Sequence, residues 1–147
     1  MTLWKRPARL ETFAERAKNT AVGHVGIEVT EIGDDFLKGR MPVDHRTRQL
    51  HGILHGGASV LFAETLGSMA ANLCLPEGEL AAVGLDINAN HLRPVADGWV
   101  YGCARALHIG ATTHVWEIRI TNAAEQLVCI SRLTMAVIRR KPAADKA

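Results

Sequence analysis

The chain has 147 residues, a length that favours one domain with a hydrophobic core of its own. Apolar residues make up 48% of it, and a formal net charge of +2 is too small for the basic surface of a typical nucleic-acid-binding protein. The first residues carry charges where a signal peptide needs an apolar core, and no run of about eighteen apolar residues could span a membrane. We therefore expect one cytoplasmic domain over residues 1–147, with neither nucleic acid nor membrane as a partner.

A short helix is predicted over residues 10–17, because apolar residues recur there at helical spacing. Its expected docking face consists of Leu10, Phe13, Ala14 and Ala17. Residues 25–32 and 36–43 read as strands, and Gly33-Asp34-Asp35 between them is a turn. The two strands should form a hairpin, which a polar loop over residues 44–54 follows.

A long helix is predicted after Gly56-Gly57, where about seventeen residues follow without a proline. Ala, Val, Leu, Phe and Met occur on every side of it, which is typical of a helix buried all round. Glu64 is the carboxylate within this stretch. A buried acid must become easier to protonate or find a hydrogen-bond donor, such as Ser68 one turn on. Because buried acids cluster at functional sites, Glu64 is a candidate catalytic residue, with a structural carboxylate as the alternative.

The start of this helix is suited to binding an anion. His55-Gly56-Gly57 brings an almost bare backbone to the helix N-terminus, where unpaired N–H groups and the helix dipole favour negative charge. An oxyanion that develops on a carbonyl is one such charge. Gln49 and His55 add hydrogen-bonding side chains nearby. Together with the Glu64 carboxylate, these groups are the parts that acyl hydrolysis requires.

The second half of the chain reads as strands joined by short connections. Pro76-Glu77-Gly78 should end the helical region. The extended segments that follow are residues 80–95, 99–109, 112–121 and 127–138. Connections as short as these join antiparallel neighbours, so we predict an α+β protein with a hairpin, a buried helix and a four-stranded meander. The sheet must curl around the helix to cover it, and the polar tail from about residue 139 should fray.

The cysteines Cys74, Cys103 and Cys129 lie far apart within apolar runs. Such positions favour buried thiols over a disulfide or a metal site. A reducing cytoplasm fits this expectation.

In its motifs, the chain resembles the hotdog-fold acyl-CoA thioesterases. The matching stretches stand in register over nearly the whole chain, and they include M-P-V-D-x-R-T, L-H-G-G-A-S, A-E-T-L-G-S, V-G-L-D-I-N-A-N-H and S-R-L-T. The chain is most similar to the bacterial branch of aryl thioesterases that act in 4-hydroxybenzoyl-CoA, 1,4-dihydroxy-2-naphthoyl-CoA (menaquinone biosynthesis) and phenylacetyl-CoA (phenylacetate degradation) metabolism. The resemblance implies an antiparallel sheet around a central helix, a homotetramer built as a dimer of dimers, and thioester hydrolysis without a metal or organic cofactor.

The resemblance also implies roles for residues of the central helix and the loop before it. Glu64 would act as nucleophile or as general base on water, and the Gly56 N–H would donate to the thioester carbonyl. Gln49 and His55 would flank that carbonyl. Ser68 would help to hold the attacking water.

Four further positions match those at which the family contacts the coenzyme A part of its substrate. They are His91, Arg93, His108 and Gly110. One departure concerns the loop, because the family often has Pro-Phe after the glutamine and this chain has Leu50-His51. Because of this difference, the rigidity of the loop and the acyl specificity need not match those of the family.

The spacing of Gly56 and Glu64 predicts an oligomer. They are eight residues apart, which is about 12 Å along one helix, so both cannot touch the same carbonyl from one chain. A working site would pair the helix N-terminus of one subunit with Glu64 of another. A thioester has a good leaving group, so a carboxylate and an oxyanion donor can suffice, and the chain has no G-x-S-x-G serine elbow.

Other interpretations are weaker. His51 and His55 have the i, i+4 spacing of zinc ligands, but the glycines around them disfavour a helix and no third ligand is evident, so we expect no metal. Asp86 to His91 matches the D-x-N-x-x-H pattern of hotdog enoyl-CoA hydratases, yet residues five apart in a strand point to opposite faces. Hydratase, proofreading thioesterase acting on an acyl carrier protein, and non-catalytic acyl-CoA-binding module remain the alternatives.

Overall fold

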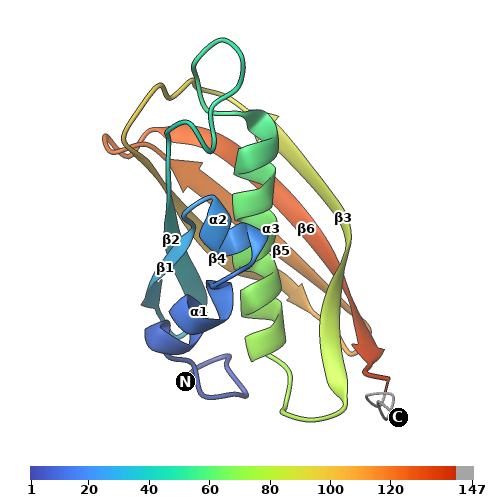
Figure 1. Cartoon of the computed structure of the whole chain (residues 1–147). Helices are drawn as coiled ribbons and strands as arrows, with labels where there is room; N and C mark the ends of the chain where they lie inside the picture. The colour runs from blue at the N-terminus through green and yellow to red at the C-terminus, as the bar shows by residue number, and fades with distance from the viewer. Residues whose placement is uncertain (142–147) are drawn as a thin grey trace.

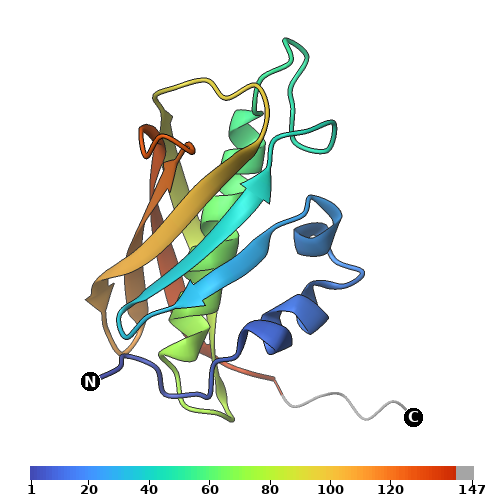
Figure 2. The ribbon, with the colours of Figure 1, turned by 90° about the vertical axis from the view of Figure 1, so that its left-hand side faces the viewer.

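The long helix α3 (Gly56–Leu73) lies in the concave face of a six-stranded antiparallel sheet in this computed structural model, which describes residues 1–141 (Figure 1). The strands are β1 (Glu28–Ile32), β2 (Phe36–Pro42), β3 (Leu80–His91), β4 (Trp99–Ile109), β5 (Thr113–Thr121) and β6 (Leu127–Arg139). The short helices α1 (Leu10–Ala17) and α2 (Ala21–His24) stand at the β1 edge of the sheet (Figure 2). The predicted α+β arrangement of a sheet curled around a central helix is confirmed. Within residues 1–141, no helix has both the length and the apolar character needed to cross a membrane.

The strand order is β1-β2-β4-β5-β6-β3, so the predicted four-stranded meander is wrong for β3. β3 pairs with β6 at one edge, whereas β4 pairs with β2 from Phe36↔Arg105 to Pro42↔Trp99. The connection over residues 92–98 passes the N-terminal end of α3 (Figure 1), where the Val95 carbonyl accepts the Leu54 N–H at 2.8 Å. Because the curled sheet places β3 and β4 on opposite sides of the helix, these two strands cannot be neighbours.

Glycines allow α3 to approach the strands closely. Phe62 and Leu66 are fully buried under β2 and β4. A Cβ atom on Gly102 would lie 2.7 Å from Leu66 Cδ1 and 2.9 Å from Phe62 Cζ, and one on Gly39 would lie 2.9 Å from Leu66 Cδ2. Side chains at these two strand positions would push the helix away from the sheet, so the core depends on their absence.

The central helix is not buried all round, which corrects the prediction from its composition. One stripe along it is only half-buried and consists of Leu61, Glu64, Thr65, Ser68, Met69 and Asn72. The sheet encloses the opposite side of the helix. Within residues 1–141, the side chains of this stripe remain partly exposed to solvent. Glu64, Thr65, Ser68 and Asn72 lie on this stripe, whereas Ser59 is buried, so the candidate catalytic carboxylate is not sealed in the core.

Helix α1 spans the predicted residues but is held less firmly than predicted. Phe13 is its one buried residue, whereas Leu10 and Ala14 are exposed and Ala17 is half-buried. The predicted docking face is therefore reduced to a single anchor. Phe13 also lines two hollows beside α1.

Several strand ends differ from the predicted ones, most at the start of β1 and the end of β3. β1 begins at Glu28 because α2 and a left-handed turn at Gly26 (φ +79°) precede it. β3 ends at His91: Leu92 and Arg93 both donate to Val128 O of β6 (2.8 and 3.4 Å), which breaks the regular ladder, and Pro94 has no N–H. β6 continues to Arg139, and the rest of the tail that was predicted to fray lies largely outside the described residues.

The cysteines are free thiols throughout the part of the chain that the structure describes. Cys74 and Cys129 are buried and Cys103 is half-buried. Burial raises the pKa of each thiol, that of Cys74 to about 11. They are therefore protonated at neutral pH and act as small apolar groups.

A buried histidine on β5 makes stability depend on pH. His114 is 1% exposed and lies beside the fully buried Trp116, with ring centroids 6.5 Å apart. His114 Nδ1 and Trp116 Nε1 have no hydrogen-bond partner within residues 1–141. Burial, and secondarily the charge of nearby His108, lowers the pKa of His114 below its ordinary value. The folded protein therefore disfavours the protonated ring.

The expected result is that stability falls as the pH drops below about 6.5, because the unfolded chain then binds a proton that folded His114 resists. Thermal unfolding of wild type, His114→Leu and His24→Gln should be compared at pH 7.5 and 5.5. His114→Leu should lose less of its melting temperature on acidification than wild type. The exposed His24 serves as the control, and its variant should behave as wild type. Equal acid sensitivity in all three proteins would assign the effect to other groups.

Candidate active site

The first turn of α3 has one N–H group that is free to bind a substrate. His55 caps the helix, and its Nδ1 accepts the Gly57 N–H at 2.8 Å. The His55 carbonyl accepts the N–H groups of Ala58 (3.0 Å) and Ser59 (3.2 Å). The Gly56 N–H has no acceptor among residues 1–141. This donor points out of a helix N-terminus, where the dipole also favours negative charge.

The loop before α3 presents Gln49 beside that N-terminus. A tight turn holds it, in which the Gln49 N–H donates to Ile53 O at 2.8 Å and Gly52 adopts φ +81°. The Gln49 side-chain oxygen accepts the His51 N–H, and its Nε2 group has no acceptor among residues 1–141. These bonds give the loop its shape although Leu50-His51 stands in place of Pro-Phe, and the Leu50 side chain is fully exposed.

A pocket of about 380 Å³ brings together Gln49, Gly56, His91 and Arg93 from three segments of the chain. The His91 ring lies against the helix N-terminus, since a Cβ atom on Gly56 would be 2.8 Å from its Nε2. Arg93 is fastened to β6 through a 2.9 Å bond from Nη1 to Leu127 O. The sequence therefore identified residues that meet around one hollow, although they are up to 44 positions apart.

Glu64 lies farther along α3, on its half-open stripe. Its Oε1 sits over Gly84 of β3, where any side chain would collide with it. Among residues 1–141 its carboxylate accepts no hydrogen bond, so Ser68, offered as one alternative for satisfying it, does not bond to it within one chain. Ser68 lies one turn beyond Glu64, and its hydroxyl likewise has no partner in the described residues. Both groups are therefore available to a water molecule or a substrate.

Asn72 fixes this part of the helix against β3. Its Nδ2 donates to Ser68 O (2.9 Å) and Ala82 O (3.0 Å), while its Oδ1 accepts the Ala82 N–H at 3.0 Å. The clamp lies two turns from Glu64 and two residues from Gly84. It holds the carboxylate at a defined place over the strand, and sequence reasoning did not identify it.

His108 and Gly110 lie apart from the other candidate residues. They are neighbours at the β4–β5 turn, where a Cβ atom on Gly110 would be 2.7 Å from His108 Nε2. This turn is at the opposite end of the sheet from the start of α3 (Figure 1). The structure therefore does not bring these two residues together with His91 and Arg93 within one chain.

The hydratase pattern does not form a dyad. Asp86 pairs with Thr134 on the outer face of the sheet, whereas His91 turns inward to the start of α3. Strand geometry thus separates the two residues as predicted. In residues 1–141, no group of three or more His, Cys, Asp or Glu side chains is arranged to hold a metal ion.

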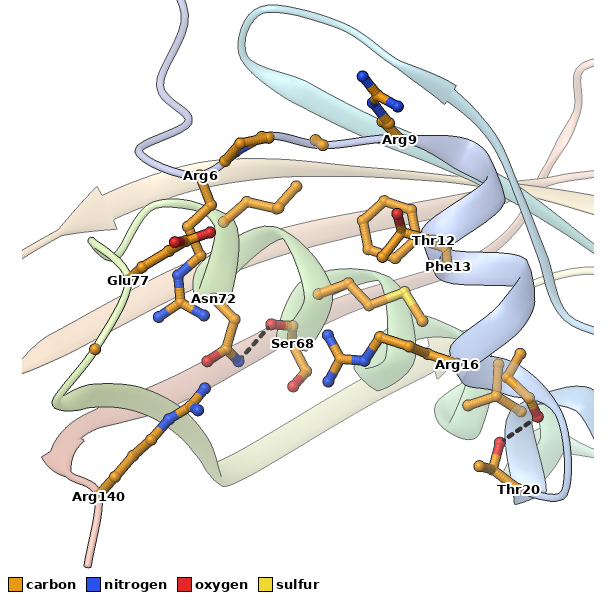
Figure 3. Close-up of a pocket in the computed structure, with 17 residues that line it drawn as sticks. Arg6, Arg9, Thr12, Phe13, Arg16, Thr20, Ser68, Asn72, Glu77 and Arg140 are labelled. Atoms are coloured by element: carbon orange, nitrogen blue, oxygen red, sulfur yellow. Dashed lines mark hydrogen bonds between the residues drawn. The ribbon is translucent and has the colours of Figure 1, made fainter. Parts of the chain in front are cut away.

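A second, larger pocket went unnoticed in the sequence. It measures about 730 Å³ and lies between the N-terminal segment and the C-terminal half of α3 (Figure 3). Ser68 and Met69 of α3 line it, together with several arginines. The sequence feature that could have indicated this pocket is the group of arginines within residues 6–16. Their position beside α3 becomes evident only in the folded chain.

Comparison with known proteins decides the family. The family model of the Thioesterase superfamily matches residues 51–129, more than half of the chain. The chain belongs to this superfamily. A crystal structure of a thioesterase from Haemophilus influenzae superposes with a TM-score of 0.91 and 50% identity, over 94% of this chain and 96% of that one. The predicted hotdog fold and the prediction of a thioester hydrolase are thereby confirmed.

Two named relatives of this thioesterase indicate the range of related activities. One is the 1,4-dihydroxy-2-naphthoyl-CoA hydrolase of Escherichia coli, 47% identical over 136 residues, which are 92% of this chain and 99% of the relative. The other is the proofreading thioesterase EntH of Cronobacter turicensis, 46% identical over 136 residues, 92% of this chain and 98% of the relative.

Proposed function

We propose that this thioesterase hydrolyses an aromatic acyl-CoA to the free acid and coenzyme A. The observation that carries the proposal is the Gly56 N–H at the start of α3, which has no acceptor among residues 1–141 and lines the same pocket as Gln49. An N–H group in this place can stabilise the oxyanion that forms when the thioester carbonyl is attacked. The relatedness to a naphthoyl-CoA hydrolase supports an aromatic acyl group.

In the proposed reaction, Glu64 attacks the carbonyl carbon or removes a proton from the water that does so. The bond from the carbonyl carbon to sulfur then breaks, and coenzyme A leaves as a thiolate that is protonated in solution. On the nucleophilic route the acyl group remains on Glu64 as an anhydride, which water hydrolyses to the free acid and the carboxylate. Ser68 would position the attacking water, and His55 would present its free Nε2 near the carbonyl. This chemistry requires neither a metal nor an organic cofactor.

We also propose that each site is shared between two subunits of a homodimer, and that two dimers form a tetramer. α3 is continuous from Gly56 to Leu73, so Gly56 and Glu64 stay about 12 Å apart within one chain. The half-open stripe that carries Glu64 supports an interface, because a second subunit could cover it. His91 and Arg93 lie at the opposite end of the sheet from His108 and Gly110 within one chain (Figure 1). Coenzyme A would therefore contact the first pair on one chain and the second pair on another.

A carrier-protein thioester is the second candidate substrate, supported by the similarity to the proofreading thioesterase. Both candidates share the phosphopantetheine arm and the thioester, so the same site could serve either. A cytoplasmic location suits both, and three free thiols fit a reducing compartment.

The test is a panel of benzoyl-CoA, 1,4-dihydroxy-2-naphthoyl-CoA, butyryl-CoA and palmitoyl-CoA, together with benzoyl-loaded carrier protein. Thiol release should be measured with a thiol-reactive dye. We expect kcat/KM for the aromatic CoA esters to exceed that for the aliphatic ones by about tenfold or more. A higher value for the carrier protein would favour the second candidate. Absence of thiol release from every substrate would refute the proposed function.

A further inference from the structure

The larger pocket is lined by one of the proposed catalytic residues. Ser68 and Met69 line it, and Ser68 is one helical turn beyond Glu64. Its volume of about 730 Å³ lies within the range of pockets that enclose small organic ligands. A thioester carbonyl held at Glu64 would therefore have room for its acyl group in this direction along α3.

The pocket has an unbalanced positive charge. Its lining includes Arg6, Arg9, Arg16 and Arg140, against one acid, Glu77. Arg6 has a structural role, because its guanidinium donates to the carbonyls of Leu75, Pro76 and Leu80 at 2.7 to 3.2 Å. The guanidinium groups of Arg9, Arg16 and Arg140 make no ion pair or side-chain hydrogen bond within residues 1–141. Their charge is available to a bound anion.

Arg16 is directed toward one of the proposed catalytic residues (Figure 3). It extends from the last turn of α1 across the pocket toward Ser68 (Figure 3). Phe13 and Met69 line the same pocket and supply apolar walls beside it. An aromatic ring between these walls would present its far edge to the basic rim of the pocket.

We propose that this pocket holds the acyl group and that Arg16 selects acyl groups with a carboxylate at the end remote from the thioester. The inference rests on the proposed function, since it takes Glu64 as the point of attack. A guanidinium binds a carboxylate through two parallel hydrogen bonds, which gives direction as well as charge. The coenzyme A phosphates are the other possible anions, but their proposed contacts, His91 and Arg93, line the separate pocket at the start of α3.

The test compares 4-carboxybenzoyl-CoA with its neutral isostere 4-carbamoylbenzoyl-CoA. Arg16→Gln should lower kcat/KM for the carboxylate by roughly five- to tenfold and leave that for the amide unchanged. Arg16→Lys should retain part of the preference, because it keeps the charge but loses the second hydrogen bond. Arg119→Gln is the control, since it removes an exposed positive charge from β5 outside the pocket.

Two outcomes would overturn the inference. An equal rise in KM for both esters would place Arg16 against coenzyme A instead of the acyl group. An equal effect of Arg119→Gln would show that only the overall charge matters.

Binding separates this inference from the proposed function. The thioethers 4-carboxyphenacyl-CoA and 4-carbamoylphenacyl-CoA cannot be hydrolysed, and their Kd values should be measured by calorimetry. Wild type should favour the carboxylate, and Arg16→Gln should abolish that preference even if no ester is turned over. Equal Kd values in wild type would refute the role of Arg16 while leaving thioester hydrolysis intact.

Discussion

Replacing Glu64 with glutamine is expected to lower the rate of thiol release on the order of 10²-fold or more. Glutamine keeps the size of the side chain but can neither attack a carbonyl nor accept a proton from water. The carboxylate makes no hydrogen bond within residues 1–141, so its replacement should leave the fold unchanged. Steady-state kinetics on the best ester of the panel provide the measurement.

Two controls accompany this variant. Its melting temperature and its mass in solution should match those of wild type, which would assign the loss to chemistry. Ser68→Ala should be less harmful, because the hydroxyl is proposed only to position water. Near wild-type turnover by Glu64→Gln would remove Glu64 from the mechanism, and an equally severe Ser68→Ala would require a direct role for Ser68.

Mixing two inactive variants, Glu64→Ala and Gln49→Ala, is expected to restore about a quarter of wild-type activity. If each site takes Glu64 from one chain and the Gln49 loop from its partner, a mixed dimer has both lesions in one site and none in the other. Random exchange makes half of the dimers mixed, and each of these has one intact site of two. The physical basis is the separation of about 12 Å between Gly56 and Glu64 along one helix.

The experiment requires proof that subunits have exchanged. One variant should carry a tag that shifts its mass, so that native mass spectrometry can count mixed dimers. Activity should then rise in proportion to the mixed fraction. If mixed dimers form and the sample stays inactive, the site lies within one chain, and Gly56 cannot act opposite Glu64.

Local sequence patterns were sufficient for most elements. The predicted bounds of α1 and β4 agree with the structure at both ends, and α3 begins at the glycine pair. Helical and strand spacing are set by neighbours along the chain, so periodicity reports them directly. Strand neighbours are set by the whole sheet, and the position of β3 beside β6 could not be inferred from the short connection that follows it.

The sequence by itself determined the central helix, its start at the glycine pair and the candidate carboxylate, and the spacing of Gly56 and Glu64 alone predicted a shared site. Only the tertiary structure showed that His55 caps the helix, that Ser68 does not bind Glu64, and that Asn72 clamps α3 to β3. It also brought arginines of the N-terminal segment to Ser68. The reason is physical: spacing along one helix is fixed by its geometry, whereas contacts between distant segments depend on how the sheet curls around that helix.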